Sequence, residues 1–154
     1  MKIKQIDGAE SSLVVDLFDK YRMFYQQPSD RDLAQRFLQA RLDNRESMIF
    51  AALVQHGGDI IPVGFTQLYP GYSSVGAFKY WVLNDLYVEP AYRNQKIGEA
   101  LVRMALDFAG GRGARFVELS TGVDNLIAQG LYERIGFRRM EEDPRFFTYR
   151  MEIN

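Results

Sequence analysis

A strand, a proline, a basic turn and a helix follow one another between Lys79 and Leu101. The apolar run from Trp81 to Leu83 predicts a strand, which should end before Pro90 because proline cannot donate to a sheet ladder. The segment after the turn has helical apolar spacing. The first amides of a helix lack internal partners and carry partial positive charge, so this order of elements predicts a phosphate site. Arg93 and Lys96 would add charge, and an ordinary solvated basic turn is the alternative.

The length of 154 residues predicts a single domain, 1–154, with a substantial core. A net charge of −1 argues against a nucleic-acid-binding domain, which needs a clear basic excess. The lack of cysteine excludes disulfides, a thiolate nucleophile and zinc–thiolate sites, and it fits a cytoplasmic protein. No apolar run resembles a signal peptide or reaches membrane-spanning length, so we expect no membrane partner. We also expect no bound metal.

The rest of the chain alternates between strand-like and helix-like segments. The expected strands are Lys2 to Ile6, Ser47 to Val54, Ile61 to Tyr69, Lys79 to Val88, Arg115 to Thr121, and two more between Phe137 and Ile153. Helices are expected after Ser11 or Ser12, after Ser29 with Asp32 as a capping box, after Gly98, and from Asn125 to Ile135 with Asp124 as N-cap. This order predicts an α/β (α+β) sandwich with a mixed sheet.

Three segments together resemble the GNAT superfamily of acetyl-CoA-dependent N-acetyltransferases. Arg93-Asn94-Gln95-Lys96-Ile97-Gly98 is similar to its pyrophosphate loop, which reads Arg or Gln, two residues, Gly, one residue, then Gly or Ala. The segment from Asn125 through Leu131-Tyr132 to Gly136-Phe137 is similar to its helix-four signature, and Val63-Gly64-Phe65 to its third strand. The two-helix start and Leu83-Asn84-Asp85 are most similar to small-molecule amine acetyltransferases, including the spermidine/spermine-type branch.

The resemblance extends from Ile3 to the last strand and implies the architecture. It implies a mixed, mostly antiparallel central sheet of about seven strands, flanked by about four helices and splayed between strands four and five. It also implies a homodimer, since family members are often homodimers, sometimes by exchange or pairing of C-terminal strands. The apolar tail Phe146-Phe147-Thr148-Tyr149 permits such pairing.

The loop departs from the family pattern at one position. Lys96 occupies the place of the first motif glycine, and Asn94 stands where glycine is frequent. A side chain at position 96 restricts the backbone if the loop needs a positive φ there, a conformation that Asn tolerates better than Lys. Lys96 could compensate by pairing with a phosphate as a point charge.

The resemblance assigns a site for acetyl-CoA. The backbone of Leu86, Tyr87 and Val88 would pair with the pantetheine arm, and an amide near Leu86 or Tyr87 would polarise the thioester carbonyl. The pyrophosphate would lie against Arg93, Asn94, Gln95, Lys96, Ile97, Gly98 and the backbone N–H of Glu99. Asn125 would contact the pantetheine region, with helix capping as its alternative role. The phenol of Tyr132 would protonate the departing thiolate, with a core aromatic as the alternative.

The implied reaction moves acetyl from acetyl-CoA to a primary amine of a small molecule by direct attack in a ternary complex. The amine must first lose a proton, because an alkylammonium has a pKa of about 10.4. Asn84 and Asp85 are the candidates on the acceptor side, and strand alternation predicts that they point to opposite faces. Asn84 could orient a water that relays the proton, while Asp85 could be a structural hydrogen-bond partner at a bulge.

An aromatic pocket is expected for the substrate. Its candidate residues are Phe24, Tyr25, Gln27, Tyr69, Trp81 and Asn84. Such a set suits an amine with an apolar body, although most of these side chains fit a core or a dimer surface equally well. The alternative functions are N-terminal acetylation of a protein or peptide, and a non-catalytic acyl-CoA sensor on the same fold.

Overall fold

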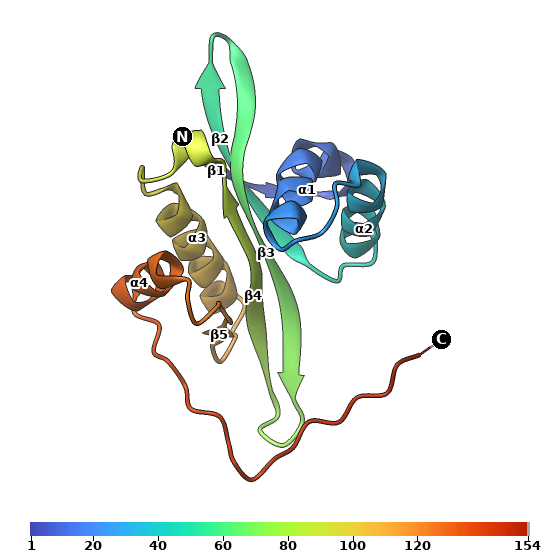
Figure 1. The fold of residues 1–154 in the computed structure, drawn as a ribbon, viewed down its shortest axis with the longest axis vertical. Helices are drawn as coiled ribbons and strands as arrows, with labels where there is room; N and C mark the ends of the chain where they lie inside the picture. Colours follow the sequence, from blue (N-terminus) through green and yellow to red (C-terminus); the bar gives the residue numbers. More distant parts are fainter. Residues whose placement is uncertain (154) are drawn as a thin grey trace. The chain divides into compact units, whose positions relative to one another are not determined.

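The computed structural model describes residues 1–153, and the chain divides into two compact units, Met1–Ser120 and the segment from Thr121 onward. Figure 1 shows the order of the elements. The first unit contains β1 (Lys2–Ile6), the 3-10 helix η1 (Gly8–Leu13), α1 (Val15–Phe24), α2 (Arg31–Asp43), β2 (Met48–His56), β3 (Asp59–Ser73), β4 (Phe78–Val88), the 3-10 helix η2 (Pro90–Tyr92), α3 (Ile97–Gly111) and β5 (Val117–Glu118). The second unit contains α4 (Leu126–Ile135).

The described strands form one sheet in the order β1-β2-β3-β4-β5. The first four strands pair antiparallel, and β5 pairs parallel with β4. This pairing consists of Trp81 with Val117 and Val82 with Glu118. Within residues 1–153, β5 therefore accompanies β4 only as far as Val82, and the mixed, mostly antiparallel sheet opens between strands four and five as expected.

The sheet is smaller than the predicted set of about seven strands. The strand expected over Arg115 to Thr121 is reduced to Val117–Glu118, and residues 137–153 form no strand in the described chain. Tail side chains such as Phe147 and Tyr149 are 84% and 90% exposed. Strand propensity depends on a neighbouring edge with which to pair, and a two-residue β5 offers almost none. The predicted terminal hairpin is therefore absent from the described residues.

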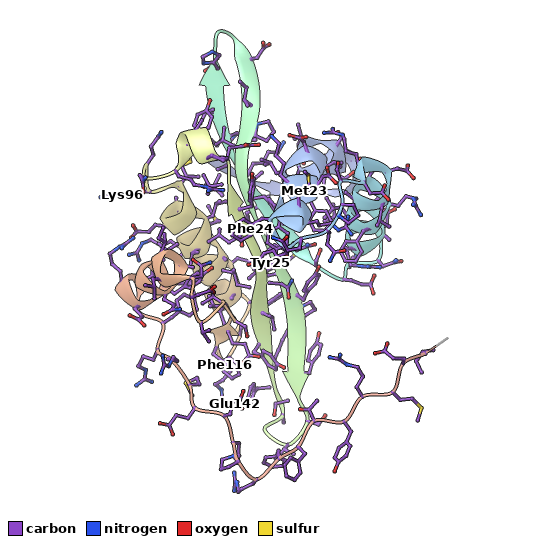
Figure 2. The ribbon with its side chains drawn as sticks, viewed as in Figure 1. Met23, Phe24, Tyr25, Lys96, Phe116 and Glu142 are labelled. Carbon is purple, nitrogen blue, oxygen red and sulfur yellow. The ribbon has the colours of Figure 1, made fainter. Side chains whose placement is uncertain are left out.

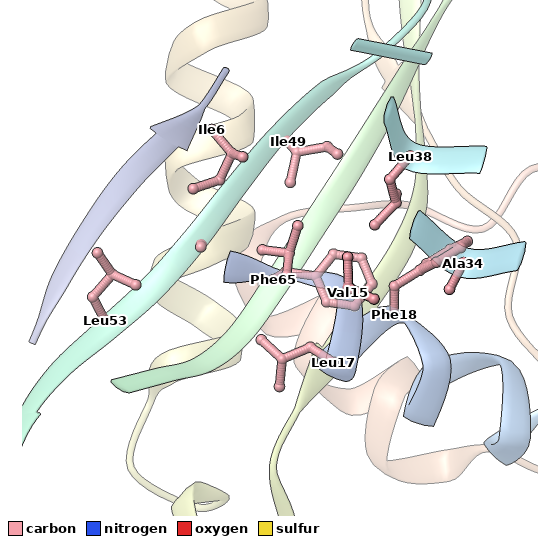
Figure 3. Close-up of a cluster of buried hydrophobic side chains, with 11 residues drawn as sticks. Ile6, Val15, Leu17, Phe18, Ala34, Leu38, Ile49, Leu53 and Phe65 are labelled. Carbon is pink, nitrogen blue, oxygen red and sulfur yellow. The ribbon is translucent and has the colours of Figure 1, made fainter. Parts of the chain in front are cut away.

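Helices cover both faces of the sheet in the first unit, with α1 and α2 on one face and α3 on the other (Figure 1). The larger core lies under α1 and α2 and is drawn in Figure 3. Phe65 of β3 is fully buried there, with its ring edge-on to Phe18 at 6.2 Å and to Tyr21 at 5.9 Å between centroids. Phe18 in turn stacks on Phe37 of α2 at 5.6 Å. The aromatic stripe of α1 thus fixes this helix over β3 and β4.

Gly64 allows α3 to pack closely on the opposite face. A Cβ at this position would lie 3.0 Å from the carbonyl oxygen of Tyr87 and 3.3 Å from Cδ1 of Leu101. Leu101, Val102 and Ala105 are fully buried on α3. The glycine of the Val63-Gly64-Phe65 motif therefore brings the helix against β3 and β4, and with it the loop that precedes the helix.

Aspartates, rather than the expected serines, cap η1 and α2. Asp7 forms a capping box with Glu10 at η1, and the side chain of Asp30 accepts the amide of Leu33 at 3.0 Å to begin α2. Ser29 instead donates its hydroxyl to the buried carboxylate of Asp19 at 2.6 Å. This bond fixes the α1–α2 connection to α1.

Asp30→Ala should lower the free energy of unfolding by about 1 kcal/mol, because it leaves an amide of the first turn of α2 without its acceptor. Asp32→Ala is the matched control, since Asp32 makes only an exposed ion pair with Arg36. That control should cost about 0.5 kcal/mol or less. Urea denaturation of both variants measures the difference, and equal losses would contradict the assignment of Asp30 as the cap.

Candidate active site

An extra residue in β4 interrupts its pairing with β3. Gln67 pairs with Asp85, but the next residue of β3 pairs with Leu83, so Asn84 is left without a β3 partner in the described sheet. Such a β-bulge disrupts the alternation of side chains. The prediction that Asn84 and Asp85 point to opposite faces is corrected accordingly: Nδ2 of the exposed Asn84 donates to Oδ1 of the buried Asp85 at 2.7 Å. Asp85 is therefore a hydrogen-bond partner at a bulge.

Asp85 holds a carboxyl group inside the sheet. Its side chain is 1% exposed, and its other oxygen, Oδ2, accepts from Nε2 of Gln67 at 2.6 Å. Burial raises the pKa of Asp85 to about 6, against the lowering effect of the hydrogen bonds from Asn84 and Gln67. At neutral pH the group is mostly ionised, and Asn84 links this buried charge to the exposed surface of the bulge.

Aromatic residues of α1 lie beside the bulge. The hydroxyl of Tyr21 donates to the backbone carbonyl of Asn84 at 3.1 Å. The Tyr21 ring contacts that of Tyr25 at 5.1 Å, and Tyr25 contacts Phe24 at 5.1 Å. Phe24 and Tyr25 are 57% and 54% exposed at the end of α1, where Figure 2 labels them. Three of the predicted substrate residues, Phe24, Tyr25 and Asn84, are thus connected through Tyr21.

The other predicted substrate residues differ in their positions. Tyr69 follows Gln67 on the same side of β3, where burial, and then the charge of Asp85, raise the pKa of its phenol. Trp81 is 6% exposed and packs on the α3 side, against Phe108 at 5.2 Å. Gln27 is exposed after α1, and its backbone N–H donates to the carbonyl of Arg22 in α1 at 3.0 Å. Only Tyr69 joins the group around Asp85.

The predicted phosphate loop connects η2 to α3. Asn94 and Lys96 both adopt the left-handed backbone conformation, with φ of 62° and 63°. No described side chain caps α3 at Lys96, whereas Asp30 and Asn125 cap α2 and α4. Nε of Arg93 donates to the carbonyl of Val88 at 2.8 Å, which holds the loop against the end of β4. An uncapped helix start that follows a basic turn is suited to an anion.

One edge of β4 has no strand partner, within residues 1–153, over the residues that sequence analysis selected. Leu86, Tyr87 and Val88 pair with β3 on one side. On the other side, β5 pairs no further than Val82 within the described chain. The carboxylate of Glu99 is turned to Arg103, one helical turn further on, at 2.9 Å. An extended ligand could therefore add to β4 and reach the loop without meeting this carboxylate.

Lys96→Gly should raise the free energy of unfolding by about 0.5–1 kcal/mol, because glycine adopts φ of 63° without a Cβ clash. Lys96→Ala keeps the clash and removes the same charge, so it should not stabilise the protein. If Lys96 pairs with the diphosphate, both variants should bind acetyl-CoA about tenfold more weakly. Thermal unfolding measures the change in stability, and calorimetry measures the affinity for acetyl-CoA. Equal stabilities of Lys96→Gly and Lys96→Ala would contradict backbone strain at Lys96.

Asn125 and Tyr132 belong to the second unit. The side chain of Asn125 accepts the amide of Ala128 at 3.2 Å and caps α4, which replaces the expected cap by Asp124. The ring of the half-buried Tyr132 lies edge-on to Phe137 at 5.8 Å. The capping role of Asn125 is thus observed, while its role toward the cofactor and that of Tyr132 stay predictions.

Two features of the described residues concern the expected absence of membrane and metal partners. No helix there is long and apolar enough to cross a membrane. No group of three or more His, Cys, Asp or Glu side chains within residues 1–153 is arranged to hold a metal ion.

Comparison with known proteins decides the family. Residues 14–137 match the model of the acetyltransferase (GNAT) family. The chain belongs to this family. It is an N-acetyltransferase of the acyltransferase class, and the GNAT family uses acetyl-CoA as its acetyl donor.

Three individual proteins show the similarity, two over the whole length of the chain and one over about half of it. It is 41% identical over 153 residues to "Uncharacterized N-acetyltransferase YhfO" of Bacillus subtilis strain 168, covering 99% of this chain and 98% of the relative. A crystal structure of a "probable acetyltransferase" superposes with a TM-score of 0.85 at 38% identity, covering 100% of this chain and 99% of the other. "N-alpha-acetyltransferase RimI" of Mycobacterium tuberculosis strain H37Rv is 39% identical over 82 residues, 51% of this chain and 49% of the relative.

Sequence reasoning did not select several residues that contact β4 at the bulge and at its end. Gln67 and Tyr21 were not selected, and neither was the ion pair of Lys20 with Glu89 at 2.6 Å, which connects α1 to the end of β4. A polar Gln within the apolar run of β3 was the one available signal. Tyr21 and Lys20 are ordinary residues of an amphipathic helix, and only the structure relates them to β4.

Proposed function

We propose that this GNAT enzyme acetylates the primary amine of a small molecule by direct attack in a ternary complex with acetyl-CoA. One observation carries the proposal: within the described residues, the edge of β4 that has no strand partner leads from the Asn84 bulge to the loop before the uncapped start of α3. Aromatic residues of α1 lie beside the bulge. An acetyl donor held along β4 would present its thioester near the bulge, and an amine would approach from the α1 side.

The residues of the first unit fit the donor. The backbone from Leu86 to Val88 would pair with the pantetheine arm, and the segment from Arg93 to Glu99 would hold the diphosphate with backbone amides and the charge of Lys96. Acetyl-CoA supplies the acetyl group as a thioester. A β4 amide at Leu86 or Tyr87 would stabilise the oxyanion that develops on the carbonyl.

Tyr132 is proposed as the acid that protonates the leaving thiolate, with Asn125 near the pantetheine. A thiol with a pKa near 8.5 and a phenol near 10 differ by about 1.5 units, or about 2 kcal/mol, which hydrogen bonding in the site can offset. Asn84 is proposed to orient a water that accepts the proton of the amine, with Asp85 supplying negative charge behind it.

The acceptor would be an amine with an apolar body. Phe24 and Tyr25 expose aromatic surface near the bulge, and Gln27 adds an amide at the α1–α2 connection. An ammonium ion can be held by such aromatic faces before it loses its proton. Trp81 is left out of this proposal because it packs on the α3 side of the sheet.

N-terminal acetylation of a peptide is the second candidate, favoured by the partial similarity to an N-alpha-acetyltransferase. A homodimer in the cytoplasm also belongs to the proposal, since the tail side chains from Phe146 to Tyr149 include exposed apolar surface that a second copy could cover. Size-exclusion chromatography with light scattering tests the dimer.

Calorimetry with acetyl-CoA, followed by thiol release over a panel of small amines and free-N-terminal peptides, tests the function. We expect micromolar binding of acetyl-CoA and turnover of at least one small amine with an apolar body. Turnover confined to peptides would favour the second candidate. Binding without turnover of any acceptor would favour an acyl-CoA sensor and contradict the proposal.

A further inference from the structure

Gln67 is a polar side chain enclosed in the middle of the sheet. It is 0% exposed on β3, and its Nε2 donates to Oδ2 of Asp85. Its carbonyl oxygen, Oε1, is buried and accepts no hydrogen bond from any described residue. A buried acceptor without a partner is unfavourable because it has lost its hydrogen bonds to water. Gln67 therefore stabilises the buried charge of Asp85 while its own Oε1 stays without a described partner, so its role centres on the carboxylate.

The bulge next to Gln67 is held by side chains from two other elements, β3 and α1. Thr66 of β3 donates its hydroxyl to the backbone carbonyl of Asp85 at 2.8 Å. Tyr21 of α1 does the same at the carbonyl of Asn84. Both backbone carbonyls are therefore satisfied, and the conformation of the bulge is fixed independently of Gln67. The contact of Gln67 acts on the carboxylate alone.

The hydrogen bonds of Asp85 determine which way the Asn84 amide faces. Gln67 occupies Oδ2, and Oδ1 accepts Nδ2 of Asn84. Because one N–H of Nδ2 is directed to Asp85, Oδ1 of Asn84 is the acceptor that remains for a ligand, beside the second N–H of Nδ2. An oxygen at this place can accept a hydrogen bond from an ammonium ion or from a relay water.

We propose that Gln67 is a positioning residue for the acceptor amine: it holds Asp85 so that Asp85 orients the amide of Asn84 with its oxygen toward the amine. This inference rests on the proposed acetyl transfer. The proposed contact with the amine is made by Oδ1 of the exposed Asn84. The buried pair of Gln67 and Asp85 prevents the Asn84 amide from flipping. Loss of Gln67 frees one carboxylate oxygen, and Asp85 can then rotate and release Asn84.

The other titratable and charged groups near Asp85 come from β3, α2 and α1, and each could contribute to a pH profile of activity. Tyr69 lies on the same side of β3, and its phenol stays protonated because burial, and then the charge of Asp85, raise its pKa. Arg41 of α2 acts on Tyr69 in the opposite direction. Tyr21 of α1 donates to the bulge. Asp85 is thus the group here that titrates between about pH 4 and pH 7.

Gln67→Leu tests the proposal, with Thr66→Val as its matched control. Both remove one hydrogen bond to Asp85 from fully buried positions of β3, but only Gln67 contacts the carboxylate. We expect Gln67→Leu to lower kcat/KM for the amine by about tenfold or more while the KM for acetyl-CoA stays within about twofold. The acidic limb of kcat should move up by about one pH unit, because a bond to the charged form is lost. Thr66→Val should leave the limb in place.

A direct titration of Asp85 separates this inference from the proposed function. Carbon-13 NMR of labelled Asp, with the Asp85 signal assigned through Asp85→Asn, should show a higher pKa in Gln67→Leu than in the wild type. An active wild type with equal acidic limbs in Gln67→Leu and Thr66→Val, or a kcat/KM of Gln67→Leu equal to that of the wild type, would overturn the role of Gln67 alone. An unchanged Asp85 titration in Gln67→Leu would overturn it as well. A wild type without turnover on any amine would instead overturn the proposed function.

Discussion

Tyr132→Phe should lower kcat by about 10²–10³-fold and leave the affinity for acetyl-CoA within about twofold, because general acid catalysis by a positioned side chain is worth that much. The substitution removes only the hydroxyl. The ring of Tyr132 packs edge-on to Phe137, and phenylalanine keeps this contact. The fold of the second unit should therefore survive, and the loss should appear in turnover alone.

Tyr149→Phe is the control, since Tyr149 is 90% exposed in the tail and the loss of its hydroxyl should leave kcat unchanged. Thiol release at saturating acetyl-CoA gives kcat, calorimetry gives the affinity, and a thermal melt checks the fold. A kcat within about threefold of the wild type, in a folded variant, would remove Tyr132 from the chemistry.

The sequence predicted the part of the fold that depends on local signals. Pro90 marked the end of β4, and the Gly110-Gly111 pair marked the end of α3, which finishes at Gly111. The prediction of two strands in the tail was wrong because alternating apolar residues satisfy strand propensity even where no sheet edge is present to pair with them. Likewise, Ser29 was a reasonable cap by type, but its hydroxyl bonds Asp19 and the adjacent Asp30 takes its place.

The part of the candidate site that lies in a sequence motif could be located from the sequence. The part that depends on contacts between distant residues could not. The loop from Arg93 to Gly98 could be located from the order of residues, including the positive φ at Lys96. The bulge at Asn84 could not, because a register shift depends on the pairing of two strands that the sequence alone does not fix. For the same reason Gln67 was overlooked, since its partner is 18 residues away along the chain.

Asp85→Asn should stabilise the protein at neutral pH. The pKa of Asp85 is raised from 3.8 to about 6 by burial, so ionisation is disfavoured in the folded state. The sign follows from linkage: the penalty is absent below about pH 4, where both states are protonated, and it grows as the pH rises to about 6. A shift of about two units corresponds to about 3 kcal/mol. The asparagine can keep both hydrogen bonds if the Gln67 amide turns and accepts through Oε1.

Urea denaturation from about pH 4 to pH 8 measures this effect. The stability of Asp85→Asn relative to the wild type should rise by about 2–3 kcal/mol between about pH 4 and pH 6 and then stay constant. Asp143→Asn is the control, because the exposed ion pair with Arg145 lowers the pKa of that carboxyl and should give a small gap of opposite sign. A pH-independent gap for Asp85→Asn would show that the carboxylate is not penalised by burial.

A crystal structure of the protein with bound CoA examines most directly how this chain holds its donor. It should place the diphosphate within hydrogen-bond distance of the amides between Asn94 and Glu99, the pantetheine along β4 from Leu86 to Val88, and the sulfur beside the hydroxyl of Tyr132. A ligand bound away from the β4 edge, or loop amides directed into the protein instead of at the phosphates, would contradict the account.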